Sequence, residues 1–228
     1  MSFTRYAVFV TPPPGEMADF CARWLGWDAA NGQACAPPDI GRLPRPVDRL
    51  TATPRRYGFH GTIKPPFRLA EGTSEAGLKA ALAEFCAGQA PVTAGTLAVA
   101  EMGPFLALRP DRPTPALDAL AGRAVAALDG FRAPLDEAAL ARRLAAGLTA
   151  AEEANLVRWG YPYVMDAFAY HMTLTGPLEP ETRAVVLAAL ADTLDPLVPR
   201  PYPIDDMTLL GEGPDGRFRH VARFALSG

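Results

Sequence analysis

The sequence predicts an α+β fold in which two pseudo-symmetric lobes, each with antiparallel strands, surround a central cleft, with a helical insert between them. The order strand, helix and hairpin occurs twice along the 228 residues. The two copies carry matching motifs at an offset of 111 residues. A segment rich in alanine and leucine separates them. We expect an N-terminal lobe at residues 1–112, a helical insert at 113–158 and a C-terminal lobe at 159–228, packed as one bilobal unit.

The composition indicates a globular protein that does not bind long nucleic acid. Hydrophobic residues make up 49% of the chain, which is enough for a buried core. The 22 Lys and Arg against 25 Asp and Glu leave a formal charge of −3, without the basic character of a protein that binds long nucleic acid. No stretch approaches about 18 uninterrupted apolar residues, the length of a membrane-spanning helix. We expect a monomeric cytoplasmic protein with no membrane partner.

The three cysteines indicate neither a disulfide scaffold nor a zinc knuckle, because they are odd in number and form no CxxC pair. Cys21 and Cys86 lie in apolar helical patterns and are predicted to be buried thiols.

The elements of the first copy follow from local patterns. Residues 6–10 are aromatic and β-branched and precede three prolines, which is typical of a strand, and a helix is expected at 16–27. Residues 36–54 contain five prolines and are expected to form a loop that wraps the surface or borders a site. A strand at 57–63, a helix at 74–87 and a hairpin with arms at 96–101 and 105–108 complete this copy.

The second copy repeats this order. A strand is predicted at 167–174, a helix at 181–194 and a hairpin with arms at 207–211 and 217–225, joined through the favoured turn pair Asp215-Gly216. In the insert, prolines and Gly130 divide residues 114–158 into two or three helices whose apolar positions are predicted core contacts.

Two histidines stand in the same local setting. Phe59-His60-Gly61-Thr62-Ile63 matches Tyr170-His171-Met172-Thr173-Leu174, and both are followed by a proline at the same distance. A single histidine on a strand is most often a satisfied structural residue. With only three histidines in the chain, the duplication favours a shared functional site. The third, His220, has no such twin and is interpreted as structural.

Strand geometry then separates polar from apolar side chains. Because side chains alternate between the two faces of a strand, His60, Thr62 and Lys64 are expected on one face. In the second copy, His171 and Thr173 share a face, whereas the residues between them are expected to enter the core. If a pseudo-two-fold axis relates the copies, both polar faces meet across one cleft.

Two imidazoles and two hydroxyls in one cleft suit reactions at phosphorus. One histidine can deprotonate water while the other, protonated, donates to the departing oxygen. Thr62 and Thr173 can donate hydrogen bonds to phosphoryl oxygens. Lys64 could add a positive charge, although its counterpart in the second copy is Thr175, so symmetry does not support that role. This chemistry requires neither a metal nor another cofactor.

The motifs His60-Gly61-Thr62-Ile63 and His171-Met172-Thr173-Leu174 resemble the paired signatures of the two-histidine phosphoesterase superfamily. Residues 5–15 and 56–67 resemble the branch associated with bacterial phosphonate-metabolism operons. The resemblance implies a bilobal α+β fold and hydrolysis or formation of cyclic phosphodiesters. It also implies a small substrate such as a 2′,3′-cyclic nucleotide or a cyclic ribose phosphate. From their positions on the two strands, we predict His60 and His171 as catalytic residues and Thr62, Thr173 and Lys64 as substrate-binding residues.

Other functions remain open from the sequence. The histidines could bind a metal, but His-x-Thr offers no third ligand at a familiar spacing. The chain could instead be a non-catalytic module that binds a nucleotide or an RNA end, or a ligase of RNA ends. Turnover of a cyclic phosphate distinguishes an enzyme from a binding module.

Overall fold

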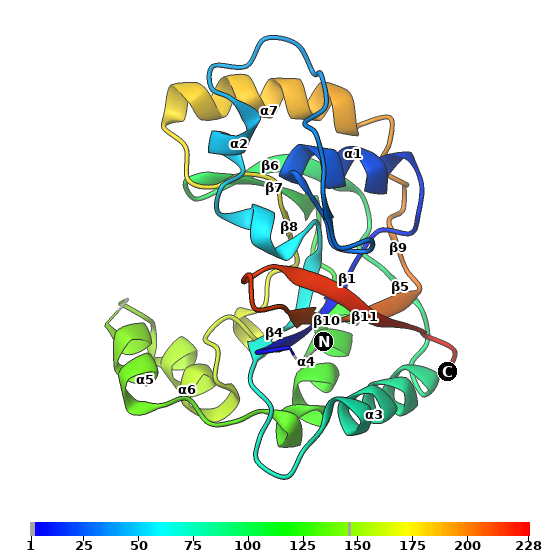
Figure 1. Ribbon diagram of the computed structural model, residues 1–228, viewed down its shortest axis with the longest axis vertical. Helices are drawn as coiled ribbons and strands as arrows, with labels where there is room; N and C mark the ends of the chain where they lie inside the picture. The colour runs from blue at the N-terminus through cyan, green and yellow to red at the C-terminus, as the bar shows by residue number, and fades with distance from the viewer. Residues whose placement is uncertain (1–2, 146) are drawn as a thin grey trace.

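The computed structural model describes residues 3–145 and 147–228 (Figure 1). Met1, Ser2 and Ala146, which fall within the ranges expected for the first lobe and the insert, lie outside the described residues. A seven-stranded sheet has the order β11-β10-β1-β4-β8-β7-β6. Its strands are β1 (Tyr6–Val10), β4 (Gly61–Phe67), β6 (Leu97–Met102), β7 (Phe105–Pro110), β8 (Met172–Thr173), β10 (Asp206–Glu212) and β11 (Phe218–Ala225).

The strand pairs of this sheet are antiparallel, which confirms the predicted α+β class with antiparallel strands. The two histidine motifs lie at its centre, where β4 pairs with β8 through Gly61 and Met172. Two small antiparallel sheets complete the strands that the structure describes. They pair β2 (Trp27–Asp28) with β3 (Gln33–Ala34) and β5 (Val92–Thr93) with β9 (Pro203–Ile204).

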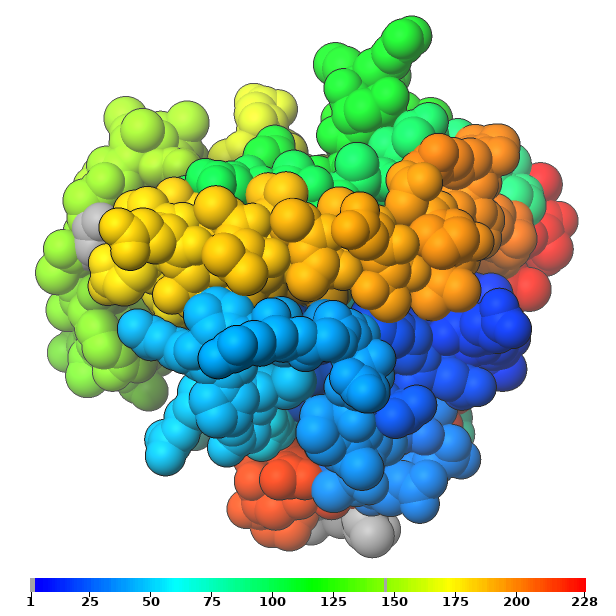
Figure 2. Space-filling model, turned by 90° about the horizontal axis from the view of Figure 1, so that it is seen from above, coloured from blue at the N-terminus to red at the C-terminus, as the bar shows by residue number. Residues whose placement is uncertain are grey.

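Helices lie at both ends of the molecule as it is drawn in Figure 1. The α-helices are α1 (Glu16–Leu25), α2 (Val47–Leu50), α3 (Glu75–Ala87), α4 (Pro115–Ala127), α5 (Glu137–Leu144), α6 (Ala150–Trp159) and α7 (Pro180–Leu194). Short 3₁₀ turns are η1 (Pro54–Tyr57), η2 (Asp129–Phe131) and η3 (Met165–Ala167). In the view from above, α7 lies across the surface with the proline-rich segment 36–54 beside it (Figure 2). No helix in the described ranges is both long and apolar enough to cross a membrane.

The hairpins pair across the division expected from the sequence. The hairpin β6–β7 follows the first histidine strand in the chain, yet it pairs with β8, the strand of the second motif. Hairpin β10–β11 pairs instead with β1, next to β4. The covering helices are exchanged in the same way, since α7 packs on β6 and α3 packs on β11. The contiguous ranges 1–112 and 159–228 are therefore not the units of strand pairing.

Two strand boundaries differ from the prediction. The strand expected at 57–63 runs from Gly61 to Phe67, and Tyr57 ends the 3₁₀ turn η1. Pro65 and Pro66 are accommodated because they lie between the positions of β4 that pair with β1, at Lys64 and Phe67. The strand expected at 167–174 is reduced to two residues.

The core confirms the predicted apolar faces. Tyr170, Met172 and Leu174 are buried, as the alternation along the second motif predicts. The indole Nε1 of Trp24, on α1, donates a hydrogen bond to the carbonyl of Leu174 at 2.8 Å. This bond links α1 to the end of the second histidine strand. Cys21 and Cys86 are buried thiols, as predicted, and burial raises the pKa of Cys86 to about 12.

Candidate active site

The two histidines are oriented by the same backbone contact. Nδ1 of His60 lies 2.9 Å from the carbonyl oxygen of Gly58, and Nδ1 of His171 lies 2.8 Å from that of Ala169. A carbonyl oxygen can only accept, so Nδ1 carries the proton in both neutral rings. In each copy the acceptor lies two residues before the histidine. Both rings are therefore left with a lone pair on Nε2, the form that a general base requires.

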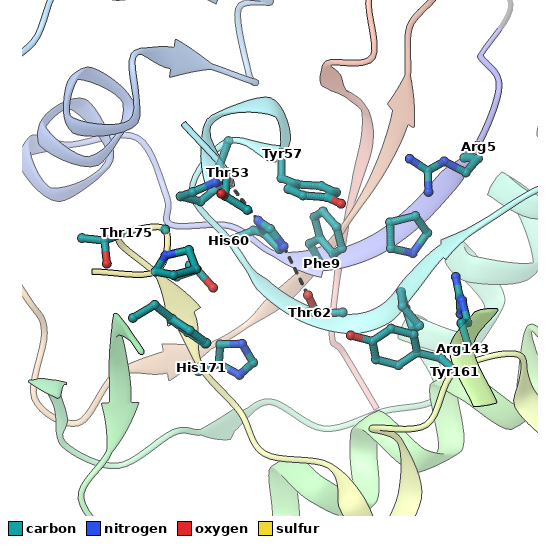
Figure 3. A pocket seen from close by; sticks show the side chains of 18 residues that line it. Arg5, Phe9, Thr53, Tyr57, His60, Thr62, Arg143, Tyr161, His171 and Thr175 are labelled. Atoms are coloured by element: carbon teal, nitrogen blue, oxygen red, sulfur yellow. Dashed lines mark hydrogen bonds between the residues drawn. The ribbon is translucent and has the colours of Figure 1, made fainter. Parts of the chain in front are cut away.

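Both histidines line one pocket of about 380 Å³ (Figure 3). The lining is drawn from segments far apart in the chain: Arg5, Phe9, Thr53, Pro54, Tyr57, Gly58, His60, Thr62, Pro65, Pro66, Phe105, Arg143, Tyr161, His171, Thr173, Thr175, Gly176 and Pro177. Thr53 and Pro54 end the proline-rich segment 36–54. Of the two alternatives expected from the sequence, a loop that wraps the surface or one that borders a site, the second describes this end of the segment. The pocket is of the size that small ligands occupy.

His60 lies in a tightly packed environment. Its ring stacks on Phe9, with a centroid distance of 3.7 Å and an interplanar angle of 19°. Its Nε2 lies 3.2 Å from Oγ1 of Thr62, whose hydroxyl is the donor because Nδ1 holds the ring proton. Burial lowers the pKa of His60 to about 4, the positive charge of His171 adds to this effect, and the Gly58 carbonyl opposes it. His60 is therefore neutral at pH 7.

His171, immediately before β8, has a related environment. The Phe105 ring lies 6.1 Å from its centroid at 49°. Burial lowers the pKa of His171, the charge of Arg109 adds to this, and the carbonyl of Ala169 opposes it. A positive charge on His171 would also disfavour protonation of His60. An anion bound beside them would raise both pKa values.

The predicted threonines lie in the same pocket as the histidines. Thr62 and Thr173 both line it and are partly buried. Thr175 also lines it, but its Oγ1 accepts a hydrogen bond of 3.0 Å from the backbone N–H of Leu106. The structure thus brings together His60, His171, Thr62 and Thr173.

Lys64 does not share the histidine face, which corrects the sequence expectation. Phe9 pairs with Thr62 but Val8 pairs with Lys64, so Ile63 is an extra residue that shifts the alternation by one. The side chain of Lys64 is 2% exposed and its Nζ donates to the carbonyl of Val125 at 2.9 Å. Its ammonium also lies 3.5 Å from Asp129. Burial lowers the pKa of Lys64 to about 8, while the charge of Asp129 opposes this.

The motifs do not include two arginines that line the pocket. Arg5 precedes β1 and is held by Glu212, which accepts hydrogen bonds of 2.6 Å from both its Nε and its Nη2. Arg143 lies near the end of α5, and its Nη1 donates to the carbonyl of Gly160 at 2.6 Å. Neither belongs to the repeat. No sequence signal distinguishes them from surface arginines.

His220 lies apart from this pocket. It lines a different surface pocket together with Asp28 and Arg223, and burial lowers its pKa to about 4. In residues 3–145 and 147–228, no three or more His, Cys, Asp or Glu side chains form a group that could hold a metal ion.

Comparison with solved structures finds similar chains over the full length. The crystal structure of E. coli LigT complexed with 3′-AMP aligns with a TM-score of 0.46 and 16% identity, covering 100% of both chains. A structure described as a phosphoesterase aligns with a TM-score of 0.42 and 15% identity, covering 99% of both chains.

Curated relatives are more similar in sequence. Ribose 1,5-bisphosphate phosphokinase PhnN of Janthinobacterium sp. (strain Marseille) is 42% identical over 179 residues, which cover 78% of this chain. The protein of the same name from Laribacter hongkongensis (strain HLHK9) is 40% identical over 177 residues, or 77% of this chain. In both cases the match covers 40% of the relative, so the chain spans less than half the length of these proteins.

A protein family matches residues 62–219, a range that contains Thr62 and the whole second histidine motif. This range is more than half of the chain. The chain therefore belongs to the family described as "Protein of unknown function (DUF1045)".

Proposed function

We propose that this chain is a metal-independent phosphoesterase that hydrolyses a small cyclic phosphodiester, with His60 and His171 as its acid–base pair. The observation that carries the proposal is the matched orientation of the two rings. Each Nδ1 is bonded to the carbonyl two residues earlier, and both rings line one pocket. Two structural histidines would not need a common pocket or a common tautomer. A pseudo-two-fold relation between the two motifs, part of the same proposal, accounts for both.

The reaction requires one proton acceptor and one proton donor. Water attacks phosphorus and its proton passes to Nε2 of the base. The ester P–O bond breaks as the acid donates its proton to the departing oxygen. One water is consumed, and the product is a phosphate monoester with a free hydroxyl. The two histidines end with their protonation states exchanged, and exchange of protons with solvent restores them.

The environments of the two rings indicate which histidine acts as the base and which as the acid. His60 is stacked on Phe9 and accepts a hydrogen bond from Thr62, both of which favour its neutral form. We assign it as the base. In the described part of the chain, no ring is stacked on His171 at the distance of the Phe9–His60 pair. We assign it as the acid, protonated when the negatively charged substrate is bound.

The surrounding side chains support an anionic substrate. None of the described residues that line the pocket is Asp or Glu, whereas two arginines line it. When substrate is bound, the Thr62 hydroxyl can turn from Nε2 of His60 toward a phosphoryl oxygen, which frees Nε2 to accept the proton of water. Thr62 and Thr173 then supply neutral donors where charge develops during the reaction.

The names of the relatives support a ribose phosphate as the substrate. Both are named for ribose 1,5-bisphosphate, a pentose that carries two phosphates. The same names support a second candidate function, transfer of a phosphoryl group to such a sugar. Because this chain matches only 40% of each relative, the kinase activity of the whole proteins is a separate proposal for this chain.

The test is a turnover assay on 2′,3′-cyclic nucleotides and cyclic ribose phosphates in the presence of a chelator. Wild type is compared with His60→Ala, His171→Ala and the control His220→Ala, which alters a histidine of a different pocket. Loss of either proton transfer is expected to lower the rate by roughly 100- to 10,000-fold, with His220→Ala near wild type. Equal rates for all four proteins would refute the proposal.

The same assay separates the rival functions. A non-catalytic binding module would retain the cyclic phosphate unchanged, and a ligase of RNA ends would join added ends and leave small cyclic phosphates intact. A kinase would form product only when ATP is added. A metal-dependent enzyme would lose its activity in the chelator.

A further inference from the structure

The part of the pocket away from His171 is lined by hydrogen-bond donors. In Figure 3, Arg5 lies at the upper right and Arg143 and Tyr161 at the lower right, whereas His171 and Thr175 lie at the left. Arg143 and Tyr161 belong to the helical insert and its exit, so the insert contributes directly to the pocket.

Arg143 keeps most of its donors available. Among the described residues, its guanidinium makes one hydrogen bond, of 2.6 Å from Nη1 to the carbonyl of Gly160, and a guanidinium has five N–H groups. Among the ion pairs of the described residues, Arg143 has no carboxylate partner. Its positive charge therefore remains uncompensated beside the pocket, in a chain whose formal charge is −3.

Arg5 and Tyr161 complete the set of donors. Glu212 holds Nε and Nη2 of Arg5 and so fixes the orientation of its guanidinium, which leaves the N–H groups of Nη1 available. Burial raises the pKa of Tyr161, and its hydroxyl therefore remains protonated and able to donate. The Arg143 guanidinium lies 5.8 Å from the centre of the Tyr161 ring.

The insert is held in place by a chain of polar contacts. Lys64 lies against Asp129, and Asp129 accepts a 2.8 Å hydrogen bond from Nε of Arg132. Nη2 of Arg132 then donates to the carbonyl of Arg158 at 3.1 Å, two residues before Gly160. The buried Lys64 thus helps to position the segment that orients Arg143, which gives this lysine a structural place.

We infer that Arg143, together with Arg5 and Tyr161, binds a second phosphate group of the substrate while the first lies between the two histidines. This inference rests on the proposed function and specifies its substrate class: a cyclic phosphodiester that carries an additional phosphate monoester. A phosphate monoester presents several oxygens to planar guanidinium donors, which bind such groups with two parallel hydrogen bonds. Arg143 is the specificity-determining residue because, of the two arginines that line the pocket, it is the one without a carboxylate partner among the described residues.

The test measures binding without turnover. Calorimetric titration compares adenosine 2′,5′-bisphosphate with adenosine 2′-monophosphate, two ligands that differ only in the second phosphate. Wild type is expected to bind the bisphosphate roughly 10- to 100-fold more tightly, the effect of one or two charge-assisted hydrogen bonds. Arg143→Gln is expected to lose this preference and to bind the monophosphate as wild type does. Arg143→Lys should retain part of the preference.

The matched control is Arg142→Gln, which removes an exposed charge from the neighbouring position of α5 that does not line the pocket. It is expected to keep the preference, and thermal unfolding verifies that each variant is folded. Equal binding of both ligands by wild type would overturn the inference, as would an equal loss in the Arg142 and Arg143 variants.

A separate measurement tests the proposed function. It compares kcat/KM for 2′,3′-cyclic AMP with kcat/KM for the same compound carrying a 5′-phosphate. Turnover of both at equal rates, with no effect of Arg143→Gln, would support the proposed function and overturn the inference. Bisphosphate binding that depends on Arg143, without turnover of either substrate, would support the inference about the second phosphate and overturn the proposed hydrolase function.

Discussion

Gly61 lies against the ring of Tyr170 so closely that a Cβ at position 61 would be 2.5 Å from the ring atoms Cε2 and Cζ and from the hydroxyl oxygen. Gly61 follows His60 and Tyr170 precedes His171. Each of the two residues is therefore next to a candidate catalytic residue in the chain, and Gly61 is the position at which β4 pairs with β8. A larger residue at position 61 is expected to change the spacing of the two strands and hence of the two imidazoles.

We expect Gly61→Ala to destabilise the fold by about 1–3 kcal/mol, because the buried Tyr170 ring cannot move away without disturbing the core. Urea unfolding measures the loss. Gly130→Ala is the control, since a Cβ there would meet no atom within 4 Å. Similar stability of the two variants would contradict the packing described for Gly61.

The stacked Phe9 ring is expected to hold the pKa of His60 low. Phe9→Leu should admit water and raise that pKa from about 4 toward the ordinary 6.5. The acid limb of the kcat/KM profile, set by the base in the free enzyme, should then move to higher pH. NMR titration of the imidazole signals measures the shift. Phe105→Leu is the matched variant and should affect His171 instead; an unchanged His60 titration in Phe9→Leu would argue against the stacking effect.

We expect Lys64 to affect how the free energy of unfolding depends on pH. Its pKa is about 8 in the folded state and 10.5 in the unfolded chain, so the unfolded state binds more protons between these values. Stability therefore rises as pH increases from 8 to 10.5, because the cost of the buried ammonium is relieved. Lys64→Met should remove this rise, as measured by urea unfolding across that range. A difference from wild type that does not vary with pH, together with a raised KM, would instead indicate direct substrate contact.

The Thr62 hydroxyl both donates to His60 and lines the pocket. Thr62→Val keeps the shape but removes the donor. We expect kcat to fall by roughly 100-fold, the usual effect of losing one donor to a developing oxyanion. Thr62→Ser restores the hydroxyl and should restore most of the rate. If valine and serine behave alike in single-turnover assays, the hydroxyl has no part in the reaction.

Local patterns predicted the elements well where one residue type dominates. The strand at Tyr6–Val10, the helix α3 and both hairpins lie within a few residues of their predicted positions. The two histidine strands were predicted, but their boundaries at 57–63 and 167–174 were wrong, because a 3₁₀ turn lies before each strand. Such turns depend on contacts with distant residues, including the irregular pairing of β4 with β1, and no local pattern encodes them.

The amino-acid sequence alone determined that two equivalent histidine strands exist and that polar and apolar side chains separate along them, because strand alternation and repetition are local properties. Only the tertiary structure decided that hairpins pair across the repeat, that Ile63 turns Lys64 away from the pocket, and that Arg5 and Arg143 line it. The reason is physical: partner strands, bulges and approaching side chains are selected by packing between segments far apart in the chain, and that packing leaves no periodic signal in either segment.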